Sequence, residues 1–212
     1  MKSTLQINNF FPGELQSNTT VAGCIDIFEK AWPMSKNTIE MIENECSDPD
    51  SGAYWSRAET FGHGPFQNIR TNRLLSVSHL ARVSGNSLLQ NIHNQFYIML
   101  LASSNPYVLK YGINERLYHE GYSLLKYGVD EEYKGHYDGG TNSGRAISAI
   151  CYLNDDYEGG EIEFPNFNVK IKPEAGMLIL FPSNFAYRHI AHPVTSGTKY
   201  AMVTWIHDRD NV

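Results

Sequence analysis

The C-terminal half of the chain alternates short β-type runs with turn signals. Apolar and β-branched runs occupy residues 146–153, 177–181 and 199–206, and Gly-rich turns such as 158–160 and 195–197 separate runs of this kind. Seven or eight short strands in this pattern are typical of a β-sandwich or a rolled barrel, with helices covering one side. The sequence therefore predicts a mainly β fold with flanking helices and a concave mouth where a ligand could sit.

Helical patterns dominate the N-terminal half. Ser35 or Asn37 is placed to cap a peripheral helix, and apolar residues recur at three- and four-residue intervals from about 79 to 103, with Gly85 as a candidate interruption. Strands are expected after Asn105-Pro106, and a short strand is also expected near residues 5–11. Residues 47–70 are expected to form a long loop, and a loop of this length is usually either disordered or functional, for example as a lid over a site.

No repeat or linker divides the sequence, so we expect a single domain over 1–212. Its helical support would span about 1–110 and its β core about 111–208.

Charge and composition limit the partners. The net charge of −6 argues against a surface that neutralises nucleic-acid phosphates, and no run of about 18 apolar residues predicts a membrane span. The N-terminus lacks the apolar core of a signal peptide. Three cysteines, Cys24, Cys46 and Cys151, form no CxxC pair and are odd in number, which favours a reducing cytoplasm over a disulfide framework.

A His-x-Asp pair and later histidines provide candidate metal ligands. His136 and Asp138 would point the same way on an extended strand, and a third ligand could come from a neighbouring strand through His189 or His192. Two imidazoles and one carboxylate on one face of a metal are the arrangement of non-haem Fe(II) oxygenases.

Five ordered motifs extend this pattern over residues 122–206. They are Tyr127-Gly-x4-Tyr133-x2-His136-x-Asp138, Cys151-Tyr-Leu-Asn154, Glu158-Gly-Gly-Glu-Ile-Glu-Phe164, Pro173-x2-Gly176, and His189-Ile-Ala-His-Pro-Val194-x2-Gly197-x-Lys199 followed by Trp205. In this order and spacing they resemble the prolyl 4-hydroxylase-like branch of the Fe(II)/2-oxoglutarate dioxygenases.

The resemblance implies a double-stranded β-helix, the cupin-like jelly roll, and a set of roles. Fe(II) would be bound by His136, Asp138 and His189, because the family ligand stands four residues before Pro-Val and ten before the basic residue. That spacing leaves His192 outside the metal site. Lys199 and Tyr152 would hold the far carboxylate of 2-oxoglutarate.

Tyr127 would line the same pocket. The implied reaction consumes 2-oxoglutarate and O2, releases succinate and hydroxylates an unactivated C–H bond, with ascorbate as a reductant and no acid–base dyad.

Prolyl hydroxylation of a peptide or protein is the main activity that the resemblance implies. Candidate substrate-groove residues are Tyr133, Arg145, Trp205 and Arg70, the last at the end of the 47–70 loop. Extended Pro-rich segments suit aromatic grooves because their bound form costs little entropy. Two alternatives stand beside this expectation: an enzyme of the same fold acting on a free amino acid or small metabolite, and a non-catalytic metal-binding jelly-roll module.

Overall fold

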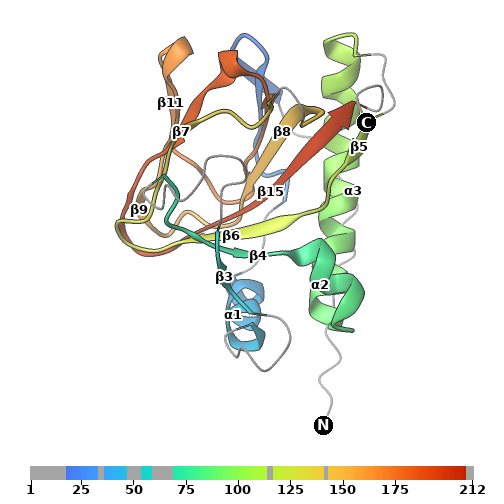
Figure 1. Cartoon of the computed structure of the whole chain (residues 1–212), viewed down its shortest axis with the longest axis vertical. Coiled ribbons are helices and arrows are strands. Elements are labelled where there is room, and N and C mark those ends of the chain that lie inside the picture. The colour runs from blue at the N-terminus through green and yellow to red at the C-terminus, as the bar shows by residue number, and fades with distance from the viewer. Residues whose placement is uncertain are drawn as a thin grey trace.

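A computed structural model describes residues 18–32, 36–46, 54–58, 69–113, 117–140 and 143–208 of the chain. The strand expected near residues 5–11 and most of the expected 47–70 loop lie outside these ranges. Figure 1 shows the β part of the molecule beside a long vertical helix, α3 (Ser87–Lys110), with the shorter helices α1 (Lys36–Glu45) and α2 (Val77–Val83) at its lower end.

Two main antiparallel sheets form the β part. The larger has the order β1-β2-β12-β8-β15-β6-β4-β3, with β5 also paired to β15. Its strands are β1 (Asn18–Ala22), β2 (Ile25–Phe28), β3 (Ser56–Arg57), β4 (Arg73–Leu75), β5 (Leu117–His119), β6 (Ser123–Tyr127), β8 (Arg145–Tyr152), β12 (Leu178–Pro182) and β15 (Lys199–Asp208).

The second sheet has the order β11-β10-β13-β7, and β14 pairs with β9 as a separate ribbon. These strands are β7 (Tyr133–His136), β9 (Glu158–Gly159), β10 (Ile162–Phe164), β11 (Val169–Ile171), β13 (His189–Ala191) and β14 (Val194–Ser196). Short 3-10 turns at Pro165–Phe167 and Phe185–Tyr187 complete this layer.

The larger sheet is buried on both faces, which explains its nearly continuous apolar runs. Because side chains alternate along a strand, Leu178 and Leu180 of β12 pack into the core shared with α3, whereas Ile179 and Phe181 pack towards the second sheet. Figure 1 shows α3 running alongside this sheet. A strand in the middle of this sheet therefore has one face towards the helices and one towards the interior of the β part.

Both predicted helical regions are confirmed, but Asn37 lies within α1 and so does not cap it, and the other candidate cap, Ser35, lies outside the described residues. The 79–103 pattern forms α2 and α3, and the interruption falls at Gly85, whose φ is +68°. The expected change to strands after Asn105-Pro106 is wrong, because α3 continues through Pro106 to Lys110.

Tertiary contacts hold this last turn despite the missing amide of proline. The Tyr107 hydroxyl donates to the carbonyl oxygen of Cys24 at 2.7 Å, and the ammonium of Lys110 lies 2.9 Å from a carboxylate oxygen of the fully buried Asp26.

Two features of the strands differ from the sequence reading. The expected run at 115–127 is divided into β5 and β6 around Gly121, whose φ of +109° is disfavoured for residues with a side chain. The β1–β2 hairpin was not predicted, although it extends the larger sheet through pairing of β2 with β12. None of the helices in the described part of the chain combines the length and apolarity needed to cross a membrane.

Two neighbouring leucines of α3 test the packing of this helix. Leu100 is 2% exposed and Leu101 is 41% exposed. We expect Leu100→Ala to lower the free energy of unfolding by about 2–5 kcal/mol, because it leaves a cavity between α3 and the sheet. The matched control Leu101→Ala should cost less than about 1 kcal/mol. Equal losses in chemical denaturation would show that the face of α3 is assigned wrongly.

Candidate metal site and cavity

Three potential ligands meet between β7 and β13. His136 ends β7, His189 begins β13, and the two are register partners in the second sheet. The Nε2 atoms of His136 and His189 lie 3.6 and 3.7 Å from the two carboxylate oxygens of Asp138, and one ligand atom from each residue lies within 4.8 Å of the others. The structure thus brings together the three residues expected from the sequence.

The backbone at Asp138 differs from the extended strand that the sequence predicts. Asp138 lies beyond the end of β7, in a bend, so its direction does not come from strand alternation. Pairing between β7 and β13 is irregular, with His136 opposite His189 but Tyr133 opposite Ala191. This irregularity places the Tyr133 and His136 rings on one side, where they stack with centroids 3.4 Å apart.

Hydrogen bonds fix the orientation of each ligand. The Nδ1–H of His136 donates to the carbonyl oxygen of Lys134 at 2.8 Å, and that of His189 donates to the carbonyl oxygen of Tyr187 at 3.1 Å. These bonds leave the Nε2 lone pair of each ring for the site. The Ser148 hydroxyl donates to Asp138 Oδ2 at 2.6 Å and lies 2.8 Å from the Ser183 hydroxyl.

The protonation states suit a divalent cation. Burial, followed by the neighbouring His189, lowers the pKa of His136, so this imidazole is neutral at ordinary pH. Burial alone would raise the pKa of Asp138, but the two imidazoles and the Ser148 and Trp205 side chains outweigh it and hold the pKa below its usual value. Two imidazole nitrogens and one carboxylate oxygen form a donor set that fits Fe(II) with positions open to other ligands.

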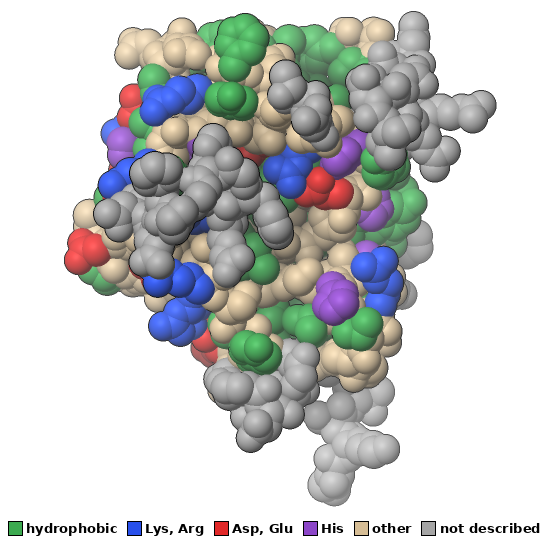
Figure 2. All heavy atoms as spheres, in the orientation of Figure 1, with side chains coloured by type: hydrophobic (Ala, Val, Ile, Leu, Met, Phe, Trp, Pro, Cys, Tyr) green, Lys and Arg blue, Asp and Glu red, His purple; other side chains and the backbone are tan. Residues whose placement is uncertain are grey.

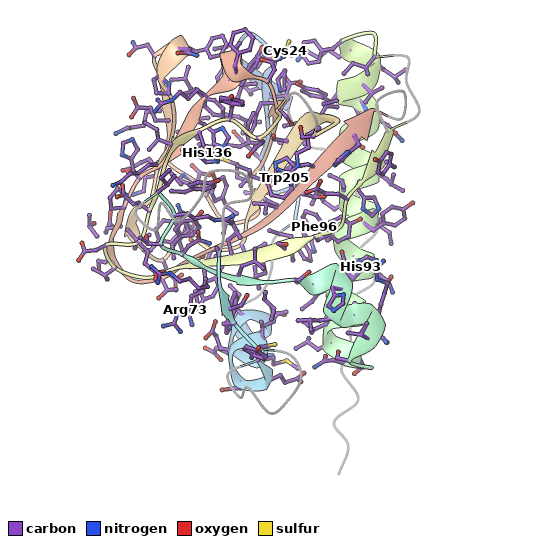
Figure 3. The ribbon with its side chains drawn as sticks, viewed as in Figure 1. Cys24, Arg73, His93, Phe96, His136 and Trp205 are labelled. Carbon is purple, nitrogen blue, oxygen red and sulfur yellow. The ribbon has the colours of Figure 1, made fainter. Side chains whose placement is uncertain are left out.

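A cavity extends from these ligands into the β part. Alternate residues of β15 line it, namely Lys199, Ala201, Val203 and Trp205, and Tyr127 and Tyr152 belong to the same lining. Figure 3 shows His136 and Trp205 within the β part, whereas His93 and Phe96 lie on the helical side. The metal ligands and the basic residue expected from the sequence therefore face one space.

Lys199 carries a buried cation without a partner of opposite charge. It is 2% exposed, its ammonium donates to the carbonyl oxygen of Gly160 at 2.9 Å, and it forms no ion pair in the described part of the chain. Burial lowers the pKa of Lys199 to about 7, and the charge of Glu161 only partly opposes this effect. The Nζ atom also lies 4.3 Å from the centroid of the Tyr127 ring. An anionic ligand would supply the missing counter-charge.

The two tyrosines near Lys199 are neutral donors. Tyr152 and Tyr127 are both buried, and burial raises the pKa of Tyr127 to about 12 and that of Tyr152 well above its usual value. A Cβ atom at Gly160 would lie 3.3 Å from Lys199 Nζ, so the absence of a side chain at this position leaves room for the ammonium.

A groove opens at the mouth of the cavity. All four residues expected to line a substrate groove, Tyr133, Arg145, Trp205 and Arg70, lie along it. The Arg145 guanidinium lies 3.7 Å from the Trp205 ring centroid, and that of Arg70 lies 4.7 Å from the Tyr133 ring centroid. Both pairs form cation–π contacts that join a charged and an aromatic group in one wall.

Several residues near the site were missed in the sequence. Ser148 hydrogen-bonds Asp138, and it could have been found as a polar residue on the inner face of an apolar strand. Glu120 and Arg188 also line the groove, but no motif marks them. His192 lies apart from the metal ligands, with its Nε2 2.6 Å from Glu163 Oε2.

Comparison with known proteins agrees with the sequence resemblance. Residues 122–207 match the family model described as the 2OG-Fe(II) oxygenase superfamily. A probable prolyl 4-hydroxylase 9 of Arabidopsis thaliana is 32% identical over 124 residues, covering 45% of this chain and 43% of that protein. A putative prolyl 4-hydroxylase of Acanthamoeba polyphaga mimivirus is 29% identical over 110 residues, covering 42% of this chain and 46% of that protein.

These alignments span less than half of either relative. They confirm the resemblance to prolyl 4-hydroxylase-like 2-oxoglutarate oxygenases in the C-terminal half of the chain.

Solved structures agree with the fold. A Trichoplax adhaerens prolyl hydroxylase in complex with a hypoxia inducible factor peptide gives a TM-score of 0.65 at 18% identity, covering 88% of this chain and 84% of that one. A Pseudomonas putida prolyl-4-hydroxylase gives 0.60 at 18% identity, covering 87% and 92%. At this identity the likeness shows the fold alone, and it confirms the mainly β jelly roll.

The hydrogen bond to Asp138 gives a test of the metal site. We expect Ser148→Ala to weaken Co(II) binding about tenfold, because the carboxylate loses the hydroxyl that orients it. Anaerobic titration followed by Co(II) absorption measures this change. Ser196→Ala, an exposed serine on β14, is the control and should leave the affinity unchanged. Equal affinities for Ser148→Ala and the unaltered protein would mean that this hydrogen bond does not support metal binding.

Proposed function

We propose that this chain is an Fe(II)- and 2-oxoglutarate-dependent dioxygenase that hydroxylates peptidyl proline, as a prolyl 4-hydroxylase. One observation carries the proposal: a single cavity is lined by the His136, Asp138 and His189 ligand set and by the buried ammonium of Lys199, which has no ion-pair partner among the described residues. A metal ligand set alone would fit many sites. A buried cation in the same cavity calls for a co-substrate that both chelates a metal and ends in an anion.

The donor chemistry supports iron with 2-oxoglutarate and O2. His136, Asp138 and His189 would hold Fe(II), which with these co-substrates supplies the oxidative decarboxylation to succinate and the oxygen atom for a C–H bond. The residues of the chain bind and orient. Ser148 holds the Asp138 carboxylate, and the backbone carbonyls of Lys134 and Tyr187 hold the two imidazoles.

Lys199 and Tyr152 would bind the far carboxylate of 2-oxoglutarate. Within the described ranges the ammonium donates to one acceptor, the carbonyl oxygen of Gly160, and thus keeps donors for a ligand. The hydroxyl of Tyr152 stays protonated and can donate to the same carboxylate. The buried ring of Tyr127 packs against the ammonium at this end of the cavity.

The groove supports a peptide substrate. Trp205, Tyr133 and the half-exposed Tyr137 offer aromatic surface, which suits an extended proline-containing segment with low conformational entropy. The Trichoplax adhaerens neighbour is a prolyl hydroxylase seen with a peptide fragment, and we extend peptide binding to this chain by similarity. Proline as the target residue rests on the prolyl 4-hydroxylase relatives.

Two further parts of the proposal concern the surroundings of the enzyme. We propose ascorbate as the reductant that restores Fe(II), on the sequence resemblance alone. We also propose a cytoplasmic location, supported by the free thiols of Cys24, Cys46 and Cys151.

A matched pair of histidines tests the metal role. His189→Ala should abolish succinate release, because it removes one of three ligands. His192→Ala should retain most of the activity, because His192 pairs with Glu163 away from the site. Succinate formation with Fe(II), 2-oxoglutarate and a Pro-rich peptide is the measurement, with His136→Ala as a second ligand variant. Retained turnover in either ligand variant would exclude this site as the centre of the reaction.

The buried ammonium predicts a pH dependence of 2-oxoglutarate binding. Because the pKa of Lys199 in the free protein is lowered to about 7, the charged form is lost as the pH rises above 7. The KM for 2-oxoglutarate should therefore rise about fivefold between pH 7 and pH 8.

Variants separate this effect from metal binding. Lys199→Ala should raise the KM and remove its pH dependence while Co(II) affinity stays close to that of the unaltered protein, and the exposed Lys172→Ala serves as control. If Lys199→Ala weakens Co(II) and 2-oxoglutarate binding equally, the assigned role of Lys199 is wrong.

A further inference from the structure

The groove outside the metal site is cationic although the chain as a whole is acidic. Arg70, Arg145 and Arg188 line it, and its acidic lining residues are Asp138 and Glu120. Asp138 faces the two metal-site histidines, and the net charge of the chain is −6. Figure 2 shows that, on the face in view, most Lys and Arg side chains lie over the β part of the molecule. Such local charge focuses a field on a ligand that enters the groove.

One of the three arginines is already neutralised. Arg145 Nη2 and Nε donate to the two carboxylate oxygens of Glu120 at 2.5 and 3.1 Å. His207 Nε2 lies 2.5 Å from the same carboxylate and helps to hold it. With its guanidinium also packed on Trp205, Arg145 has little charge left for a ligand.

Arg188 retains its full charge in the groove. It is exposed, and it forms no ion pair within the described ranges. Its guanidinium packs against the backbone of Gly135, where a Cβ atom would lie 1.9 Å from Arg188 Nη2. Glycine at this position thus leaves the space in which the guanidinium lies, directly beside the metal ligand His136.

Arg70 provides a second available guanidinium. Its Nε donates to Asn72 Oδ1 at 2.8 Å, its guanidinium stacks on Tyr133, and no carboxylate pairs with it in the part of the chain that the structure describes. Arg70 forms an isolated bridge with Tyr133 of β7, while Arg188 packs on Gly135 of the same strand. Both free guanidinium groups therefore border the strand that carries His136.

We propose that Arg188 and Arg70 bind a carboxylate of the substrate close to the hydroxylated residue, so that the enzyme selects acidic substrates. This inference rests on the proposed function and names the substrate class of the same site. Guanidinium groups form directed, charge-assisted hydrogen bonds with carboxylates, and the absence of a side chain at Gly135 leaves room for one of them beside His136. An uncharged proline-rich peptide would leave both groups without a counter-charge.

The carboxylate has two possible sources. An aspartate or glutamate side chain near the target residue would supply it within a peptide chain. A free α-carboxyl group would supply it in a C-terminal residue or a free amino acid. The chemistry at the guanidinium groups is the same, and peptides distinguish the two sources.

Peptide binding tests the proposal without turnover. The protein is loaded with Mn(II) and 2-oxoglutarate under anaerobic conditions, and fluorescent proline-containing peptides are titrated by anisotropy. One series carries Glu or Gln at each of three positions on either side of the proline, and a second has a free or an amidated C-terminus. At low salt we expect one acidic peptide to bind about five- to tenfold more tightly than its neutral partner.

Variants assign the preference to the two arginines. Arg188→Gln should reduce the acidic-to-neutral ratio to below about twofold and Arg70→Gln should reduce it in part, whereas Arg188→Lys should restore some of it. Arg82→Gln, an exposed arginine on α2, is the matched control and should keep the full ratio. Mn(II) affinity is measured for each variant, and because the readout is a ratio, a general loss of binding does not imitate the effect.

The outcomes separate this inference from the proposed function. The inference would be overturned if every peptide pair gave an acidic-to-neutral affinity ratio below about twofold in the unaltered protein. It would also be overturned if no peptide bound detectably. A ratio that survives in both Arg188→Gln and Arg70→Gln would also overturn it. Charge-selective binding with no 2-oxoglutarate consumption in air with Fe(II) would instead support the inference and contradict the dioxygenase proposal.

Discussion

Burial of the larger sheet on both faces is the constraint on which the rest of the structure depends. Along β15, Met202 and Ile206 pack into the core shared with α3, and Lys199 and Trp205 face the cavity. The helices cover one face, and the second sheet packs against the opposite face and encloses an interior there. A polar group on that inner face is costly unless it finds a partner, so its presence there indicates a ligand or a hydrogen-bond network.

Much of the site could be predicted from the sequence because its motifs, in their order and spacing, resemble those of the Fe(II)/2-oxoglutarate dioxygenases. His136, Asp138 and His189 were expected together, and the structure places their ligand atoms within 4.8 Å of one another. Lys199 and Tyr152 were expected to share a pocket, and both line the same cavity. The pattern of short strands and turns predicted the β fold, whereas the family resemblance implied His189 as the third ligand and the shared pocket of Lys199 and Tyr152. The roles of these residues in binding iron and 2-oxoglutarate stay predictions.

Other features depend on contacts between distant segments and left no local signal. Local propensity ends a helix near Pro106, but the buried Tyr107 and the pairing of Lys110 with Asp26 continue it. Strand alternation predicted correctly that Asp138 lies in the site, but for the wrong reason. Asp138 lies in a bend, where the Ser148 hydroxyl donates a hydrogen bond to its carboxylate. The sequence around Arg188 does not predict its place in the groove. That place depends on Gly135, which is distant in the sequence and leaves room for the arginine side chain.

The close packing of Arg188 on Gly135 also couples these two positions, which lie far apart in the sequence. A Cβ atom at position 135 would lie 1.9 Å from Arg188 Nη2, so a side chain there requires the guanidinium to shift, as the end of an exposed arginine can do. The residue at position 135 therefore controls where the Arg188 guanidinium can lie, and a side chain there would displace this charge from its place beside His136.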